Sequence, residues 1–195
     1  MVTALECLDQ DQLEIGKRSA GLGTGTFRVR DSSGRLVLLA KRTMLKIPAT
    51  IHVHDAGDRE TEVLTVGGRG QGQGNSLLWD VADPATGQKL GAISRDMVKS
   101  MFGRGEYVLT NKSDTEVARV QDPGLPMRLL CNGLLIPLTY TVIVGNATAC
   151  SLTWGLNPMR LKLRVRFSEA PTPSVDRRLI LAAALVVMAM ESRVP

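Results

Sequence analysis

SVDRRLILAAALVVMAMES, residues Ser174–Ser192, decides the fold, because its segment Leu179–Met190 contains no polar side chain. A surface helix keeps polar residues on its outer face, whereas a helix that is apolar all the way round has to be buried on every side. The run is also shorter than the roughly 17 to 20 apolar residues needed to cross a bilayer. We therefore predict a hydrophobic helix over residues 176–191 that the rest of the chain encloses.

A hairpin pattern recurs four times before this helix: an aromatic residue opens an alternating apolar run, a polar turn follows, and a second alternating run closes the unit. The turns are rich in Gly, Asn, Asp and Pro, which tolerate left-handed backbone or preset a tight bend. A fifth hairpin joins Thr50–Asp55 to Thr61–Val66. The four copies of the pattern are Phe27–Arg42, Trp79–Ser94, Tyr107–Gln121 and Tyr140–Trp154.

Two single strands, Gln12–Lys17 and Arg160–Phe167, complete a set of twelve strands. So many strands favour closure, which removes exposed sheet edges, and a barrel of this width leaves a hollow that its own wall cannot fill. We predict a mainly β protein, a single domain over residues 1–195, built as a closed antiparallel barrel of about twelve strands around the hydrophobic helix. Three segments are less regular: residues 67–75 are predicted to be a flexible Gly-rich loop, Arg95–Phe102 a helical turn or a strand, and Pro126–Leu135 a short helix or a connector.

Composition sets weak limits on function. The 195 residues include 24 lysines and arginines against 19 acids, a net charge of +5, which permits an anionic partner but also serves solubility. The three cysteines are widely spaced and form no C-x-x-C motif, so we expect reduced thiols. The first residues do not resemble a secretory signal. A cytoplasmic protein without a transmembrane span is expected, with attachment to a membrane surface as an option.

Motifs for catalysis, metals and cofactors are poorly supported. The glycine-rich stretches at residues 21–26 and 67–74 lack the strand before and helix after that a phosphate-binding loop requires. His52 and His54 lie two apart and would share one face of a strand, which makes them candidate metal ligands, but no third ligand is evident. Neither histidine lies beside a suitable nucleophile, so no catalytic residue and no cofactor is predicted.

The segment Arg160–Phe167, RLKLRVRF, alternates without a fault. On a strand its apolar residues face inward and its cations form an outer row with a spacing of about 7 Å. The row is either an ordinary solvated exterior, paired with acids, or a stripe that binds the phosphates of lipid headgroups or nucleic acid. The predicted anionic-ligand residues are Arg160, Lys162, Arg164, Arg166, Arg28 and Arg30, with Arg35, Lys41 and Arg42 as possible additions.

Three segments carry a family resemblance: RDMVKSMFGRGEYVLTN (Arg95–Asn111), PLTYTV (Pro137–Val142) and FSEAPTPSVDRRLILAAALVVMAMES (Phe167–Ser192). They resemble the tubby C-terminal-like superfamily, in particular its phospholipid scramblase and LURP-one-related branch. The resemblance implies a twelve-stranded barrel threaded by its C-terminal helix. Tubby proteins bind phosphoinositides, and scramblases are associated with calcium-dependent lipid movement. Scramblases place several acids before the terminal helix, where this chain has Glu169 and Asp176, so the resemblance does not carry calcium binding with it.

Charge and resemblance together predict a non-enzymatic barrel domain that binds an anionic ligand, with phospholipid headgroups as the first candidate. A nucleic-acid-associated regulatory protein is the alternative, because the same charges attract either phosphate. An enzyme with its site at the barrel mouth is a second alternative, which rests on the fold alone. The sequence does not indicate an oligomeric state.

Overall fold

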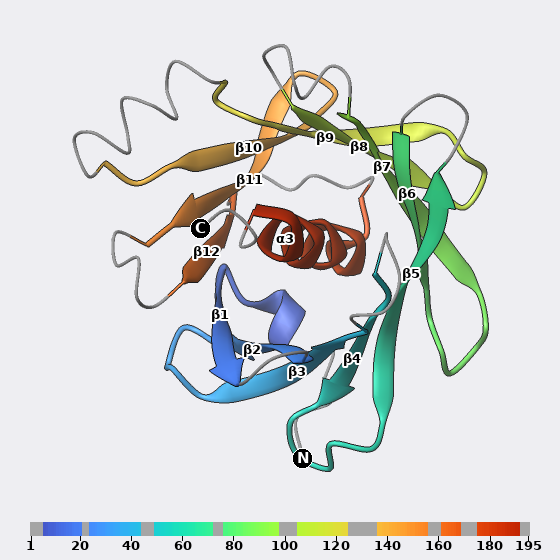
Figure 1. The fold of residues 1–195 in the computed structure, drawn as a ribbon. Helices are drawn as coiled ribbons and strands as arrows, with labels where there is room; N and C mark the ends of the chain where they lie inside the picture. Colours follow the sequence, from blue (N-terminus) through green and yellow to red (C-terminus); the bar gives the residue numbers. More distant parts are fainter. Residues whose placement is uncertain are drawn as a thin grey trace.

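A computed structural model describes residues 6–20, 24–43, 49–71, 76–97, 105–124, 136–155, 161–168 and 175–191. Twelve antiparallel strands follow one another around a closed barrel, and the first strand pairs with the last. Figure 1 shows the helix α3 lying inside the wall of strands. The prediction of a closed twelve-stranded barrel around a C-terminal helix is confirmed.

Each predicted hairpin is present, and so are the two single strands. The elements are the short helix η1 (Glu6–Asp9), the strands β1 (Gln12–Ala20), β2 (Thr24–Arg30), β3 (Leu36–Arg42), β4 (Ile51–Asp55), β5 (Glu62–Gln71), β6 (Ser76–Ala82), β7 (Lys89–Asp96), β8 (Glu106–Asn111), β9 (Glu116–Gln121), β10 (Thr139–Val144), β11 (Ala147–Trp154) and β12 (Lys162–Phe167), and the helix α3 (Arg177–Glu191).

The glycine-rich segment corrects one prediction. Gly67–Gln71 does not form a loop but continues β5, which pairs with β6 up to the contact of Gln71 with Leu77. The ladder needs only backbone groups, and the register shifts between Gly68 and Gly70, where small residues accommodate a bulge. Of the other irregular segments, Arg95 and Asp96 belong to β7, and residues 72–75, 98–102 and 126–135 lie outside the described residues.

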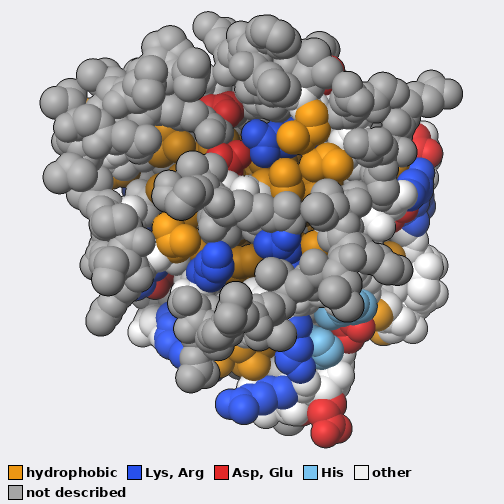
Figure 2. All heavy atoms as spheres, in the orientation of Figure 1, with side chains coloured by type: hydrophobic (Ala, Val, Ile, Leu, Met, Phe, Trp, Pro, Cys, Tyr) orange, Lys and Arg blue, Asp and Glu red, His pale blue; other side chains and the backbone are white. Residues whose placement is uncertain are grey.

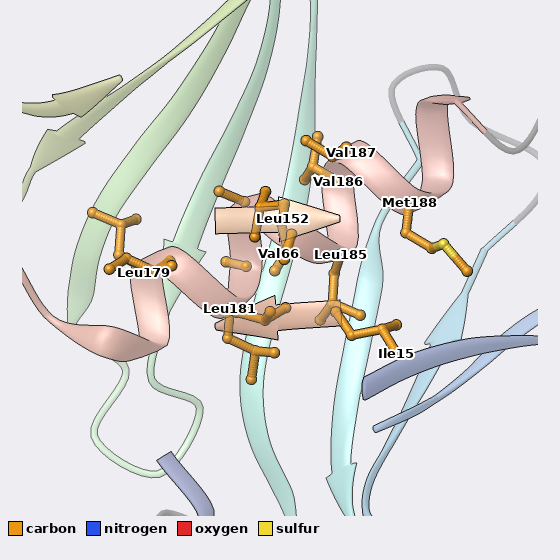
Figure 3. Packing of buried hydrophobic residues seen from close by; sticks show 14 of the residues in the cluster. Ile15, Val66, Leu152, Leu179, Leu181, Leu185, Val186, Val187 and Met188 are labelled. Carbon is orange, nitrogen blue, oxygen red and sulfur yellow. The ribbon is translucent and has the colours of Figure 1, made fainter. Parts of the chain in front are cut away.

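The helix α3 is enclosed on all sides. Its residues from Leu179 to Ala189 are buried without a break. Figure 3 shows Leu181 and Leu185 packed in one cluster with side chains from β1, β5 and β11, so the helix contacts more than one side of the wall. Among the described residues, no helix combines the length and the apolar character that a membrane span requires.

Polar groups fix both ends of the helix. At its start, Asp176 Oδ1 accepts a hydrogen bond of 2.9 Å from the backbone N–H of Arg178, as an N-cap does, and the Arg178 side chain pairs with Asp83 at 3.2 Å. At its end, Arg95 pairs with Glu191 at 3.1 Å, and Arg42 donates to the carbonyl of Ala189. Cations at a helix C-terminus also offset the macrodipole.

Two buried cysteines give a first testable prediction. Burial raises the pKa of the Cys7 thiol to about 11 and that of the Cys150 thiol to about 12, so both remain protonated at neutral pH. In a Cys131→Ser variant, the native protein should react with a thiol reagent at pH 8 about a hundredfold more slowly than free cysteine, and both thiols should react after denaturation. Rapid labelling of the folded variant would show that the barrel admits the reagent.

Candidate anion-binding surface

The outer faces of β12, β1 and β2 bring the predicted cations together. Along β12, Leu163, Val165 and Phe167 are buried and the residues between them are exposed, as the alternation predicts. The strand β1 lies between β12 and β2 in the closed barrel. We use the name basic face for the described outward cations of β2 and β12, the two strands that flank β1, which are Arg28, Arg30, Lys162, Arg164 and Arg166. Arg160 lies outside the described residues.

The strand register places these cations in rows across β1. Arg164 and Arg30 are the partners of Glu14 on its two sides. Lys162 and Arg28 are in the same way the partners of Gly16. Residues opposite one another on adjacent strands point to the same side of the sheet, and neighbouring strands are about 4.8 Å apart. The five cations therefore form one contiguous surface rather than separate stripes.

Only part of this charge is neutralised within the protein. Lys162 Nζ lies 2.7 Å from Glu14 Oε1, and Arg30 donates to the carbonyl of Gly34 at 2.7 Å. Within the described part of the chain, Arg28, Arg164 and Arg166 have no ion-pair partner. Glu14 is the one acid among the described outward side chains of the three strands, so five cations less one acid leave a charge of +4 on the face. Exposed ion pairs such as Lys162–Glu14 contribute little stability and can exchange for another partner.

The three possible additions have different surroundings. Lys41 is exposed and pairs in register with Thr26 of β2, so it extends the basic face at its edge. Arg35 lies in the β2–β3 turn and pairs with Asp31 at 3.1 Å. The suggestion that Arg42 joins the face is wrong, because the alternation that exposes Lys41 turns Arg42 toward the barrel interior, where it contacts the end of α3.

The two histidines of β4 point to the same outer side, as predicted, since Ile51 and Val53 on either side of His52 are buried. His52 Nδ1 lies 2.8 Å from Glu62 Oε1. Burial acts to raise the pKa of Glu62, but hydrogen bonds from Thr65 and His52 outweigh it and hold the pKa below its ordinary value. Within the described ranges, no group of three or more potential ligands is arranged to hold a metal ion. Figure 2 shows both histidines next to basic and acidic side chains.

One larger hollow, of about 300 Å³, opens between the turns of β6–β7 and β8–β9 and the start of α3. Its lining includes the apolar side chains of Leu90, Val117 and Leu179. The carboxylate in its lining, Asp176, pairs with Arg178 at 2.7 Å and caps the helix. Both oxygens of this carboxylate thus already have structural partners, and the hollow gives no observation that favours an enzyme.

Sequence reasoning missed two residues of the surface, Glu14 and Gly16. Both lie on β1, which was predicted as a strand, but a single strand carries no sign of its neighbours. The predicted closure of the barrel was the one feature from which these two residues could have been identified. A barrel made of consecutive hairpins must pair its first strand with its last, so the cations of β12 and β2 must flank β1.

Comparisons with known proteins define the fold and nothing finer. No family model and no curated protein matches the chain. An X-ray structure of a protein from Arabidopsis thaliana is similar over 98% of this chain and 98% of its own, with a TM-score of 0.53 and 15% sequence identity. At this identity the similarity shows a shared fold. It assigns no activity or ligand to this chain.

Proposed function

We propose that the protein is a non-enzymatic barrel domain of the tubby-like kind, related to scramblases and LURP-one-related proteins, that binds anionic phospholipid headgroups through the basic face. The observation that supports the proposal is the gathering of five cations from β2 and β12, the two strands that flank β1, around a single acid on β1. The family resemblance, with its lipid-binding members, points in the same direction.

The size of the charge is adequate for this role. A basic residue close to an anionic membrane contributes about 1 kcal/mol of attraction. A net charge of four on the face then corresponds to about 4 kcal/mol, or a partition roughly a thousandfold in favour of an anionic over a neutral surface. The described residues of the face include no aromatic side chain on which nucleic-acid bases could stack, so lipid phosphate is favoured over single-stranded nucleic acid.

A pair of triple variants tests the proposal by vesicle flotation. In the first variant, Lys162, Arg164 and Arg166 are changed together to Ser. In the control variant, three cations on β5, the β8–β9 turn and β9 are changed to Ser; they are Arg69, Lys112 and Arg119. Both variants lose three charges from the same total of +5. The basic-face variant removes the Lys162–Glu14 pair, and the control removes the pairs of Arg69 with Asp80 and of Arg119 with Glu116, so the folding of each variant is checked by its thermal transition. The basic-face variant should bind vesicles that contain phosphatidylserine about a hundredfold more weakly, and the control should bind nearly as the wild type does.

Two outcomes contradict the proposal. An equal loss in both triple variants would mean that net charge alone governs attraction. A wild-type protein with no preference for anionic over neutral vesicles at low salt would exclude lipid binding by this surface. Tighter binding to duplex DNA than to anionic vesicles, measured at two salt concentrations, would favour the nucleic-acid alternative.

A further inference from the structure

Gly16 occupies the centre of the basic face and leaves a gap there. It lies on β1 between its register partners Lys162 and Arg28. In the other described rows of the face, the β1 residue has a side chain that covers this position. A Cβ atom built on Gly16 would meet no atom within 4 Å. The surface is therefore open down to the backbone between two cations.

The fold does not require a glycine at this position. Gly16 has no positive φ, so its backbone conformation is one that any residue adopts. A glycine within a regular element destabilises the fold by roughly 0.5–1 kcal/mol relative to alanine. Glycines inside strands often mark a place where a ligand or another backbone approaches closely. Among the described residues no backbone approaches the space over Gly16, which leaves this space open to a ligand.

The neighbours of the gap define what would fit. The backbones of Arg28 and Lys162 are about 10 Å apart across β1, so both side chains can reach a small group held over Gly16. Within the described residues the Arg28 side chain has no hydrogen-bond partner, and Lys162 Nζ is held by Glu14 at 2.7 Å. Glu14 is the next outward residue along β1, and its carboxylate repels any negative group that extends from the gap toward it. A compact anion with enough charge to draw Lys162 away from Glu14 matches these conditions.

We propose that the gap over Gly16 is the seat of a terminal phosphate group, a phosphomonoester held between Arg28 and Lys162. This inference rests on the proposed function and specifies its ligand. A phosphomonoester carries a charge of about −1.5 to −2 and three acceptor oxygens, so it can engage both cations at once. The Arg28 guanidinium can bind two of these oxygens in parallel. A phosphodiester has one charge and substituents on both sides, and it fits a gap one side chain wide less well.

The test compares Gly16→Val with Gly67→Val, a second outward strand glycine whose added Cβ would meet its nearest atom, the Asp80 carbonyl oxygen, at 3.9 Å. Binding is measured to vesicles that contain phosphatidate or phosphatidylglycerol, with the lipid fractions adjusted to the same surface charge. The wild type should prefer phosphatidate about tenfold, Gly16→Val should bind both vesicles equally, and Gly67→Val should behave as the wild type does. A Glu14→Gln variant should bind phosphatidate more tightly, because Lys162 is released.

A soluble probe separates this inference from the proposed function. Glycerol 3-phosphate should shift the amide resonances of β1 around Gly16, and Gly16→Val should abolish the shift. If the protein binds no anionic vesicle but the shift is present, the site over Gly16 binds free phosphate esters, and the proposal of membrane binding is wrong. If anionic vesicles bind without a preference for phosphatidate and glycerol 3-phosphate causes no shift, the seat over Gly16 is wrong.

Discussion

Leu185→Asp should leave no folded protein. Leu185 lies in the middle of α3, has no exposed surface, and is surrounded by other buried side chains of the core cluster (Figure 3). An unpaired carboxylate buried there costs several kcal/mol even if it takes up a proton, a large share of the roughly 5–15 kcal/mol by which a domain is stable. The expected result is insoluble expression, or a soluble chain without a cooperative thermal transition by circular dichroism.

Leu185→Ala is the control, because it removes side-chain volume without adding a charge. It should remain folded and lose about 2–5 kcal/mol of unfolding free energy. A Leu185→Asp protein that unfolds cooperatively near the wild-type midpoint would show that this residue does not lie in the core.

Gly91→Ala should destabilise the barrel by roughly 3 kcal/mol or more, although the change adds one methyl group. The added Cβ would lie 2.1 Å from the carbonyl oxygen of Thr110 and 3.3 Å from Leu179 Cδ1. The first contact is with the backbone of β8, so β7 and β8 would have to separate where Gly91 pairs with Asn111. Urea denaturation should show a much lower midpoint at an unchanged slope.

Gly16→Ala is the matched substitution, since it also adds a methyl group to a strand glycine. Its Cβ meets no atom within 4 Å, and we expect unchanged or slightly raised stability. Equal losses in the two variants would mean that the strand contacts around Gly91 are looser than the structure shows.

Much of the fold was predictable because its signals are local. Alternating apolar residues and polar turns identify hairpins, and the uninterrupted apolar run predicts a helix over residues 176–191, one residue longer than α3 because Asp176 is its N-cap. The prediction of a loop for Gly67–Gln71 was wrong. Glycine has no side chain that could contribute to an alternation of apolar and polar residues, but its backbone still pairs with β6. The requirement for Gly91 was equally hidden, because it arises from contacts with β8 and α3.

The candidate surface was predictable in its cations but not in its arrangement. The outer row of β12 follows from alternation, and Arg28 and Arg30 follow from their strand. The contact of Lys162 with Glu14 joins residues 148 positions apart and exists because the barrel closes. Arg42 was misplaced because one residue of register reverses the side to which a strand residue points. Lipid binding itself stays a prediction.

A site-specific fluorescence measurement tests most directly whether the basic face meets the membrane. The label is attached at Ser151→Cys or at Ser94→Cys, each in a Cys131→Ser background. Ser151 lies on β11 as the register partner of Arg166, whereas Ser94 lies on β7, six strands away from β1 around the barrel. Both are partly buried serines on strands, so the two labelled proteins differ chiefly in the side of the barrel they report.

Vesicles that contain phosphatidylserine and a nitroxide-bearing lipid are then added to each labelled protein. We predict strong quenching of the label at residue 151, little quenching at residue 94, and loss of the difference when Lys162, Arg164 and Arg166 are changed to Ser. Equal quenching at both positions, or stronger quenching at residue 94, would contradict the assignment of membrane binding to the basic face.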